Sequence, residues 1–353
     1  MKNNLLYFKN EYGDADNFPV ELVEKVSGAC YSFDGYFCIS KKKDVVKKAL
    51  EYLLGISDFV VVCDDGGFAE NVISSLYGKV PLNSIKNVSR TKLALTEKTA
   101  SEFVEKTLIP AMDKFNSHSY SKSVFRFFGE VKEDLEDILK QAVAESENTL
   151  FYRLWTENKY DVLLYVVYDD KTPKMLLDKL NKSIVLNFGD QLYAEDDYSL
   201  KQRIVDYATL RRIKMSVAES FTGGNIARTI VSVPGASAMF YEGAVTYDTN
   251  AKIERLGVDR QTVDKYTVVS SQVASEMVKG LLSTGNCQVA VSTTGYAGPN
   301  VGDEDNAGLC FIGVGTEKGI NVYKFKFDGS RNEIINEATS YALFLAFKEI
   351  KNY

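Results

Sequence analysis

Residues 218–224, Ala-Glu-Ser-Phe-Thr-Gly-Gly, combine hydroxyl side chains with a pair of glycines. The run stands between a pattern that predicts a strand and one that predicts a helix. Gly223 and Gly224 let a ligand approach backbone N–H groups closely, and a helix start favours an anion such as a phosphate or an oxyanion. The run therefore predicts a ligand-binding loop, with an ordinary capping turn as the alternative.

Three other loops carry residues that suit ligand binding. Lys252 follows a predicted strand and stands at a helix start, where the helix dipole disfavours a cation. Residues 292–300 form a glycine-rich loop after an apolar strand, and Arg331 opens the last predicted helix, where it suits a phosphate or carboxylate. Solvated surface side chains are the alternative for both Lys252 and Arg331.

The single histidine of the chain restricts the possible chemistry. His118 lies in a polar, loop-like stretch without catalytic partners, and we expect it to be solvated. A Ser-His-Asp triad within the carboxy-terminal region and a multi-histidine metal centre are both excluded.

The elements that position these loops alternate between strands and helices. In α/β sheets, ligands bind on the loops at the carboxyl ends of the strands. The pattern predicts a mostly parallel or mixed sheet with helices on both faces. The predicted strands are 215–218, 243–247, 288–292, 308–315 and 321–327, and the predicted helices are 199–213, 222–231, 270–283 and 332–350, with Ser199 and Ser270 as caps.

The amino-terminal part of the chain predicts two further α/β regions. We expect domains at residues 1–120, 121–197 and 198–353, with a serine-rich boundary near residue 120 and an acidic connection at 189–197. Within the first, the pattern predicts helices at 43–54, 69–77 and 96–115 and a strand at 59–63. The small second region is predicted as strands 123–128 and 160–168, helices 130–144 and 174–182, and a short strand at 184–186.

Composition and charge place few further constraints. The net charge of −6 gives no reason to expect nucleic-acid or membrane binding. No apolar run has the length of a membrane span, the amino terminus does not resemble a signal peptide, and the five cysteines are scattered. We therefore expect a cytoplasmic protein with reduced thiols.

The loops together resemble the CinA carboxy-terminal family, which includes nicotinamide-nucleotide amidases. The motifs occur in the family's order and extend over almost all of residues 199–350. They are Ala-Glu-Ser-Phe-Thr-Gly-Gly (218–224), Pro-Gly-Ala-Ser (234–237), Gly-Ala-Val-Thr-Tyr-Asp-Thr-Asn-Ala-Lys (243–252), Leu-Gly-Val (256–258), Val-Ser (269–270), Thr-Gly-Tyr-Ala-Gly-Pro (294–299) and Gly-Ser-Arg (329–331).

The resemblance implies a role for each matching residue. It implies a hydrolase of the nicotinamide mononucleotide amide that needs no cofactor or metal and acts in pyridine-nucleotide salvage. Ser220 matches the nucleophile, Lys252 its base, and Tyr247 a tyrosine near that pair. The implied substrate-binding residues are Thr222, Gly223, Gly224, Asn250, Thr294, Gly295, Gly298 and Arg331.

Elementary chemistry agrees with a serine–lysine pair. A serine hydroxyl is a poor nucleophile until a neighbouring base removes its proton. A lysine serves as that base if its pKa falls from about 10.4 toward about 7–8, which burial and a second cation such as Arg331 would favour.

The remainder of the chain resembles the other parts of CinA proteins less closely. Full-length members carry a molybdopterin-binding-like domain and a small linker domain, and the first of these is degenerate here, because its glycine loop is replaced by residues 63–68. We expect its ADP-ribose pyrophosphatase activity to be lost. Asp64 and Asp65 predict a solvated turn, with a divalent cation site as the alternative. The resemblance suggests a homodimer, and a catalytically weak or inactive nucleotide-binding regulatory protein is the alternative function.

Overall fold

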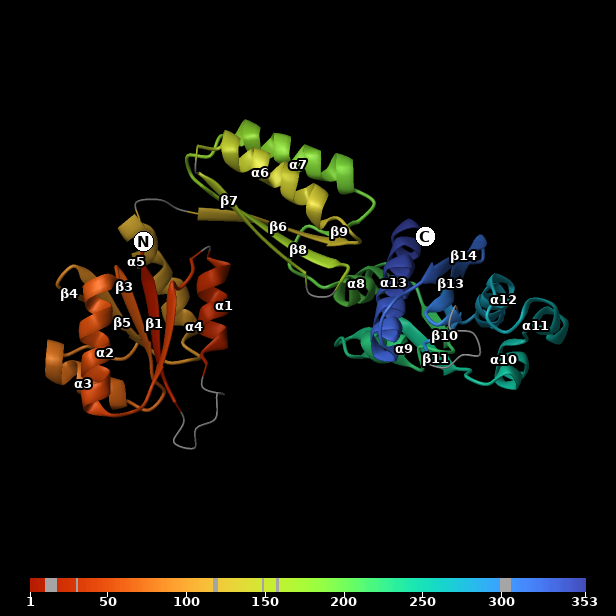
Figure 1. Cartoon of the computed structure of the whole chain (residues 1–353), viewed down its shortest axis with the longest axis horizontal. Helices are drawn as coiled ribbons and strands as arrows, with labels where there is room; N and C mark the ends of the chain where they lie inside the picture. The colour runs from red at the N-terminus through yellow and green to blue at the C-terminus, as the bar shows by residue number, and fades with distance from the viewer. Residues whose placement is uncertain (10–17, 30, 117–119, 148, 157–158, 299–305) are drawn as a thin grey trace. The chain divides into compact units, whose positions relative to one another are not determined.

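The computed structural model describes residues 1–9, 18–29, 31–116, 120–147, 149–156, 159–298 and 306–353. His118 lies outside these residues. The chain divides into two compact units, one formed by residues 1–123, 139–153 and 166–180 and the other by residues 124–138, 154–165 and 181–353. The fold is of the mixed α/β class, with three sheets flanked by helices, as the sequence predicts (Figure 1).

The first sheet has the order β2-β1-β3-β5-β4, and only β4 is antiparallel to its neighbour. All five residues of β3 are buried, because alternate side chains enter cores on the two faces of the sheet. The strands are β1 (Asn3–Phe8), β2 (Gly35–Ile39), β3 (Phe59–Cys63), β4 (Ser84–Val88) and β5 (Thr91–Thr96). The helices are α1 (Val20–Gly28), α2 (Lys43–Ile56), α3 (Phe68–Tyr77), α4 (Ser101–Phe103) and α5 (Ile109–Asn116), with a π-helical stretch over Val104–Leu108.

The helix predicted over 96–115 is wrong at its start. Thr96 ends β5, and the helical segment begins at Ser101. Thr96 is fully buried and pairs with Cys63 of β3, so sheet pairing keeps this residue extended.

The second sheet has the order β7-β8-β6-β9. The strand predicted over 184–186 is wrong, because these residues lie within α7. Ile184 is buried while Val185 and Leu186 are exposed, as a helical period requires. The elements are β6 (Tyr120–Phe128), α6 (Lys132–Glu145), β7 (Leu150–Thr156), β8 (Asp161–Asp169), α7 (Lys174–Phe188) and β9 (Leu192–Ala194).

The third sheet has the order β11-β10-β12-β13-β14. Strands β10, β11 and β12 are parallel, while β13 and β14 continue the sheet in antiparallel fashion, so the predicted mixed sheet is confirmed. The strands are β10 (Met215–Glu219), β11 (Phe240–Val245), β12 (Val289–Gly295), β13 (Leu309–Thr316) and β14 (Gly319–Lys326).

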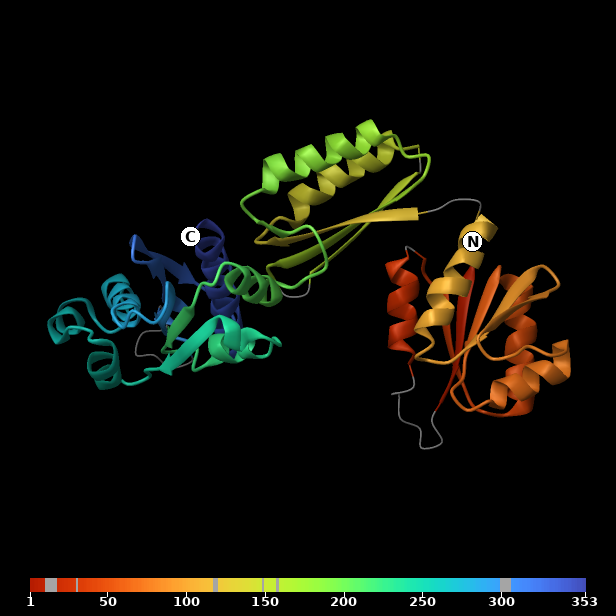
Figure 2. The same cartoon turned by 180° about the vertical axis from the view of Figure 1, so that it is seen from behind.

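Helices cover both faces of this third sheet (Figures 1 and 2). Met215 and Val217 of β10 enter the core that contains α8, α9 and α13, whereas Ala218 enters the core beneath α10 and α12. The helices are α8 (Leu200–Leu210), α9 (Asn225–Val231), α10 (Thr249–Leu256), α11 (Arg260–Tyr266), α12 (Ser271–Leu282) and α13 (Arg331–Asn352). Ser270 caps α12 through its hydroxyl, as predicted, whereas Ser199 stands before α8 without such a bond.

Residues before the third sheet also contribute to its core. Phe128 and Tyr160 pack in the same cluster as α13, where the ring of Phe128 stacks on Phe344 with centroids 4.6 Å apart. The Tyr160 hydroxyl donates a 3.1 Å hydrogen bond to Glu337. Among the described residues, no helix is both long enough and apolar enough to cross a membrane.

Candidate functional site

The carboxyl ends of β10, β11 and β12 form one edge of the third sheet. Glu219, the last residue of β10, pairs with Val245 of β11 and Thr293 of β12. The next residue, Ser220, donates its backbone N–H to the Thr293 carbonyl at 3.0 Å, and the Thr246 N–H donates to the Glu219 carbonyl at 2.8 Å. Ser220 and Thr246 therefore occupy adjacent positions on neighbouring strands, which lie about 4.8 Å apart in a sheet.

Ser220 begins a tight turn that precedes α9. Gly223 and Gly224 have φ values of +61° and +97°, a conformation that favours glycine. The Ser220 side chain is buried, and its hydroxyl has no hydrogen-bond partner among the residues that the structure describes. The backbone N–H groups of Phe221 and Thr222 also donate to no acceptor within the described part of the chain.

The N–H groups at the start of α9 bind an internal carboxylate. Glu219 is fully buried, and its side chain accepts hydrogen bonds from the N–H groups of Gly224 at 3.0 Å, Ile226 at 3.1 Å and Ala227 at 2.8 Å. A substrate anion therefore cannot use these three groups while Glu219 holds them. Sequence reasoning assigned no role to Glu219, although an acidic residue just before a helix start is a recognised stabilising feature.

Lys252 is buried at the same edge of the sheet. Asp248 caps α10 by accepting the Asn250 N–H at 2.7 Å, and Lys252 is the fourth residue of that helix. Helical side chains lean toward the helix start, so the Lys252 amine reaches back and donates to the carbonyls of Thr246 at 2.7 Å and Tyr247 at 3.0 Å. Only 1% of Lys252 is exposed, which rules out a solvated surface lysine.

The environment of Lys252 lowers its pKa to about 8. Burial is the larger cause, because it penalises the charged ammonium, and the Asp248 carboxylate opposes the shift. From the sequence, we expect burial and a second cation such as Arg331 to lower this pKa. Burial does lower it, whereas Arg331 is not among the causes.

Arg331 contacts two residues, Tyr247 and Gly298, which follow the carboxyl ends of β11 and β12. The Arg331 guanidinium donates to the Gly298 carbonyl at 2.9 Å and to the Tyr247 hydroxyl at 3.4 Å. Tyr247 remains largely exposed. Residue Arg331 at the start of α13 thus joins two loops that are distant in sequence.

The other residues predicted to bind substrate have internal partners. The Asn250 amide oxygen accepts from Arg260 at 2.9 Å, and the buried Thr294 hydroxyl donates to the Val268 carbonyl at 2.9 Å. A Cβ atom on Gly295 would lie only 2.5 Å from the Cys310 Cβ, so close packing of β12 against β13 requires glycine here. Thr222 shares a 2.7 Å hydroxyl hydrogen bond with Thr293.

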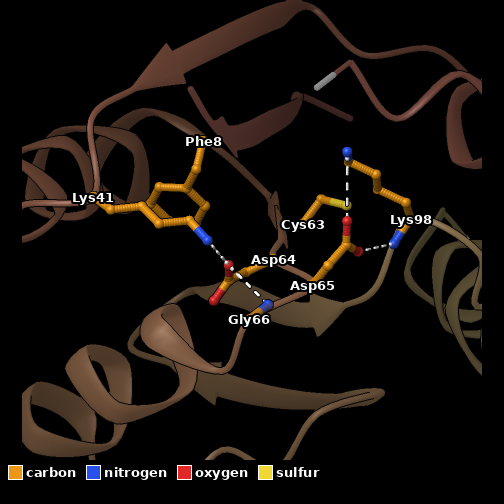
Figure 3. A pocket seen from close by; sticks show the side chains of 7 residues that line it. All are labelled: Phe8, Lys41, Cys63, Asp64, Asp65, Gly66 and Lys98. Atoms are coloured by element: carbon orange, nitrogen blue, oxygen red, sulfur yellow. Dashed lines mark hydrogen bonds and ion pairs between the residues drawn. The ribbon is translucent and has the colours of Figure 1, made fainter. Parts of the chain in front are cut away.

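A pocket of about 210 Å³ lies at the carboxyl edge of the first sheet (Figure 3). The prediction of a solvated turn is wrong for Asp64, which is only 3% exposed and accepts a 2.7 Å hydrogen bond from the Ala69 N–H. Lys41 lies 3.1 Å from Asp64, and Lys98 lies 3.4 Å from Asp65. Each carboxylate therefore already has a lysine as its counter-ion, which argues against the alternative of a divalent cation site here.

A family model for the CinA C-terminal domain matches residues 197–350. The carboxy-terminal part of the chain belongs to the CinA family. A Caldicellulosiruptor saccharolyticus protein that carries the name competence-damage inducible protein is 33% identical over 253 residues, which are 70% of this chain and 61% of that protein. An Alkaliphilus oremlandii protein of the same name is 32% identical over 255 residues, which are 70% of this chain and 60% of that protein. The chain thus spans about three fifths of the length of these CinA relatives.

Solved CinA superfamily structures match a shorter part of the chain. A CinA superfamily protein from Klebsiella pneumoniae is 26% identical with a TM-score of 0.42, over 44% of this chain and 97% of that protein. The competence/damage inducible protein CihA from Agrobacterium tumefaciens is 33% identical with a TM-score of 0.41, over 42% of this chain and 93% of that protein.

Proposed function

We propose that the CinA domain of this chain hydrolyses the carboxamide of nicotinamide mononucleotide, giving nicotinate mononucleotide and ammonia. Ser220 is the nucleophile and Lys252 is its base. The observation that carries this proposal is the buried Lys252 amine, bonded to the Thr246 carbonyl next to the Ser220 strand end, with its pKa lowered to about 8. A base with such a pKa is partly neutral at physiological pH.

The hydrogen bonds of Lys252 suit a neutral amine. A neutral primary amine has two N–H groups and one lone pair. The carbonyls of Thr246 and Tyr247 can accept both N–H groups, which leaves the lone pair directed away from them. That lone pair is the acceptor for the Ser220 proton, directly or through one water molecule.

Two backbone N–H groups next to Ser220 are suited to stabilise the oxyanion that acyl transfer produces. An oxyanion develops on the carboxamide oxygen when serine attacks, and fixed donors stabilise it. The N–H groups of Phe221 and Thr222 have no acceptor among the described residues and immediately follow the nucleophile. We assign them to the oxyanion, in place of the Gly224 N–H that Glu219 holds.

The reaction has two steps, acylation of Ser220 and hydrolysis of the resulting ester, and neither step needs a cofactor. The Ser220 oxygen forms a bond to the carboxamide carbon while its proton passes to Lys252. The C–N bond then breaks, and the leaving nitrogen takes that proton and departs as ammonia. Water, deprotonated by Lys252, then attacks the ester carbon. The bond to the Ser220 oxygen breaks, this oxygen takes the proton back from Lys252, and the acid product ionises to the carboxylate by releasing its proton to solvent.

Tyr247 and Arg331 are proposed to hold the substrate beside the pair. Their hydrogen bond at 3.4 Å and the exposure of Tyr247 leave both side chains able to meet a ligand. Asn250, Thr294 and Gly295 are proposed to shape the surrounding loops, since each has an internal partner or packing contact.

Ammonia release from nicotinamide mononucleotide tests the proposal, with wild type compared with Ser220→Ala and Lys252→Ala. We expect turnover by the wild type and a loss of at least about 1,000-fold in each variant, the order seen when a catalytic nucleophile or base is removed. Full activity in both variants would refute the proposal. Absence of turnover combined with stabilisation of the wild type by the nucleotide would favour the regulatory, ligand-binding alternative.

A further inference from the structure

A cavity of about 410 Å³ opens beside the turn that follows Ser220. It lies between the first turns of α9 and α13, and we call it the Arg228 cavity. Its volume is within the range of small-molecule sites. The lining residues are Thr222, Gly223, Gly224, Asn225, Arg228, Asn332, Ile335 and Asn336.

The described residues that line the Arg228 cavity are rich in hydrogen-bond donors and include no carboxylate. The Asn225 amide donates to the Asn336 oxygen at 3.2 Å and to the Thr339 hydroxyl at 3.0 Å, which ties α9 to α13. Because the Asn336 oxygen is the acceptor, the Asn336 NH₂ group remains as a donor. Such a lining favours a ligand that supplies acceptors and negative charge.

Arg228 supplies the positive charge of this cavity. Its exposed guanidinium has no hydrogen bond and no ion pair with any residue that the structure describes. Arg331, at the start of α13, instead donates to the Gly298 carbonyl and the Tyr247 hydroxyl, beside the serine–lysine pair. The Glu219 carboxylate is fully buried, accepts three backbone N–H groups and forms no ion pair with Arg228 among the described residues.

We propose that the Arg228 cavity binds the phosphate of a phosphomonoester, with Arg228 and Asn336 as donors to its oxygens. The inference rests on the proposed function: a nucleotide whose amide lies at Ser220 would extend its phosphate past Thr222 into this cavity. A guanidinium suits a phosphate because it offers parallel N–H donors. The cavity would then make the enzyme prefer a nucleotide over the corresponding nucleoside.

Steady-state kinetics with nicotinamide mononucleotide and nicotinamide riboside provide the first test. For Arg228→Gln we expect KM for the nucleotide to rise about 10-fold or more, the order expected for a lost charged hydrogen bond. The kcat for the nucleotide and all constants for the riboside should stay within about twofold, and Arg228→Lys should recover part of the loss. Lys279→Gln, which removes a charge from an exposed position on α12, is the matched control.

Thermal shift with ribose 5-phosphate provides the second test and does not require turnover. We expect this probe, but not ribose, to stabilise the wild type and Lys279→Gln, and to stabilise Arg228→Gln much less. Amidase activity with an unchanged preference for the nucleotide in Arg228→Gln would overturn the cavity assignment and leave the amidase standing. Arg228-dependent binding of ribose 5-phosphate without amidase activity would overturn the proposed function and support the phosphate site.

Discussion

The Lys252 amine donates a 2.7 Å hydrogen bond to the carbonyl of Thr246, the residue whose own N–H binds the β10 strand end just before Ser220. Through this contact, a side chain of helix α10 reaches the carboxyl edge of the third sheet, where Ser220 also lies. Because the amine is buried there, its pKa falls to about 8, so a fraction of the amine is neutral at physiological pH.

The pH dependence of the amidase reaction should follow Lys252. The amine is a base only when neutral, so kcat/KM should rise with pH, with a slope near one below about pH 8, and level off above it. Initial rates in constant-ionic-strength buffers from pH 6 to 9.5 measure this profile, and Lys279→Gln should share it. A flat profile over that range would show that a different group limits the reaction.

The burial of Lys252 should also affect stability. The unfolded chain binds more protons than the folded chain between pH about 8 and 10.5, so wild-type stability gains a contribution as pH rises through that window. We expect Lys252→Met to lack this gain, which amounts to about 3 kcal/mol from the pKa difference. Urea unfolding of both proteins at pH 7 and pH 10.5 measures the change, and an equal stability difference at both pH values would contradict it.

Glu219→Gln should destabilise the fold and impair the site together. In the wild type, three backbone N–H groups donate to the Glu219 carboxylate. The substitution replaces one carboxylate oxygen by an NH₂ group, so at least one of these N–H donors loses its acceptor. We expect a loss of about 2–3 kcal/mol in the free energy of unfolding, measured by urea denaturation, and a lower kcat at temperatures where the variant remains folded. Glu333→Gln is a less disruptive comparison, because Glu333 is exposed in the capping box of α13. A Glu219→Gln protein as stable as the wild type would mean that these bonds contribute little.

The existence of the five strands of the third sheet and the loops of the site could be predicted from the sequence, because strands there are short apolar runs followed by polar turns. The order in which these strands pair was not predicted. The hydrogen-bond partners of the side chains in these loops could not be predicted. Thr294 bonds to Val268 and Asn250 to Arg260 through contacts that only the folded chain creates. The burial of Lys252 was also hidden, since a lysine in a polar helical stretch gives no local sign of being covered.

Phe128→Ala should weaken the packing of β6 against α13. Phe128 is 2% exposed and lies within 5.0 Å, ring centre to ring centre, of Tyr341 and Phe344. We expect a loss of about 3–5 kcal/mol, the usual effect of removing a buried phenyl ring, in urea unfolding followed by the fluorescence of Trp155. Phe151→Ala, at a position that is 47% exposed, should change stability by less than about 0.5 kcal/mol. Equal effects of the two substitutions would argue against this packing.

The most direct test of the serine–lysine pair is a double-variant comparison of ammonia release from nicotinamide mononucleotide. If Ser220 and Lys252 act as one unit, then Ser220→Ala, Lys252→Ala and the double variant should all retain a similar residual kcat, because losing either member already removes the whole contribution. Losses that multiply in the double variant, or substantial turnover in either single variant, would contradict the account.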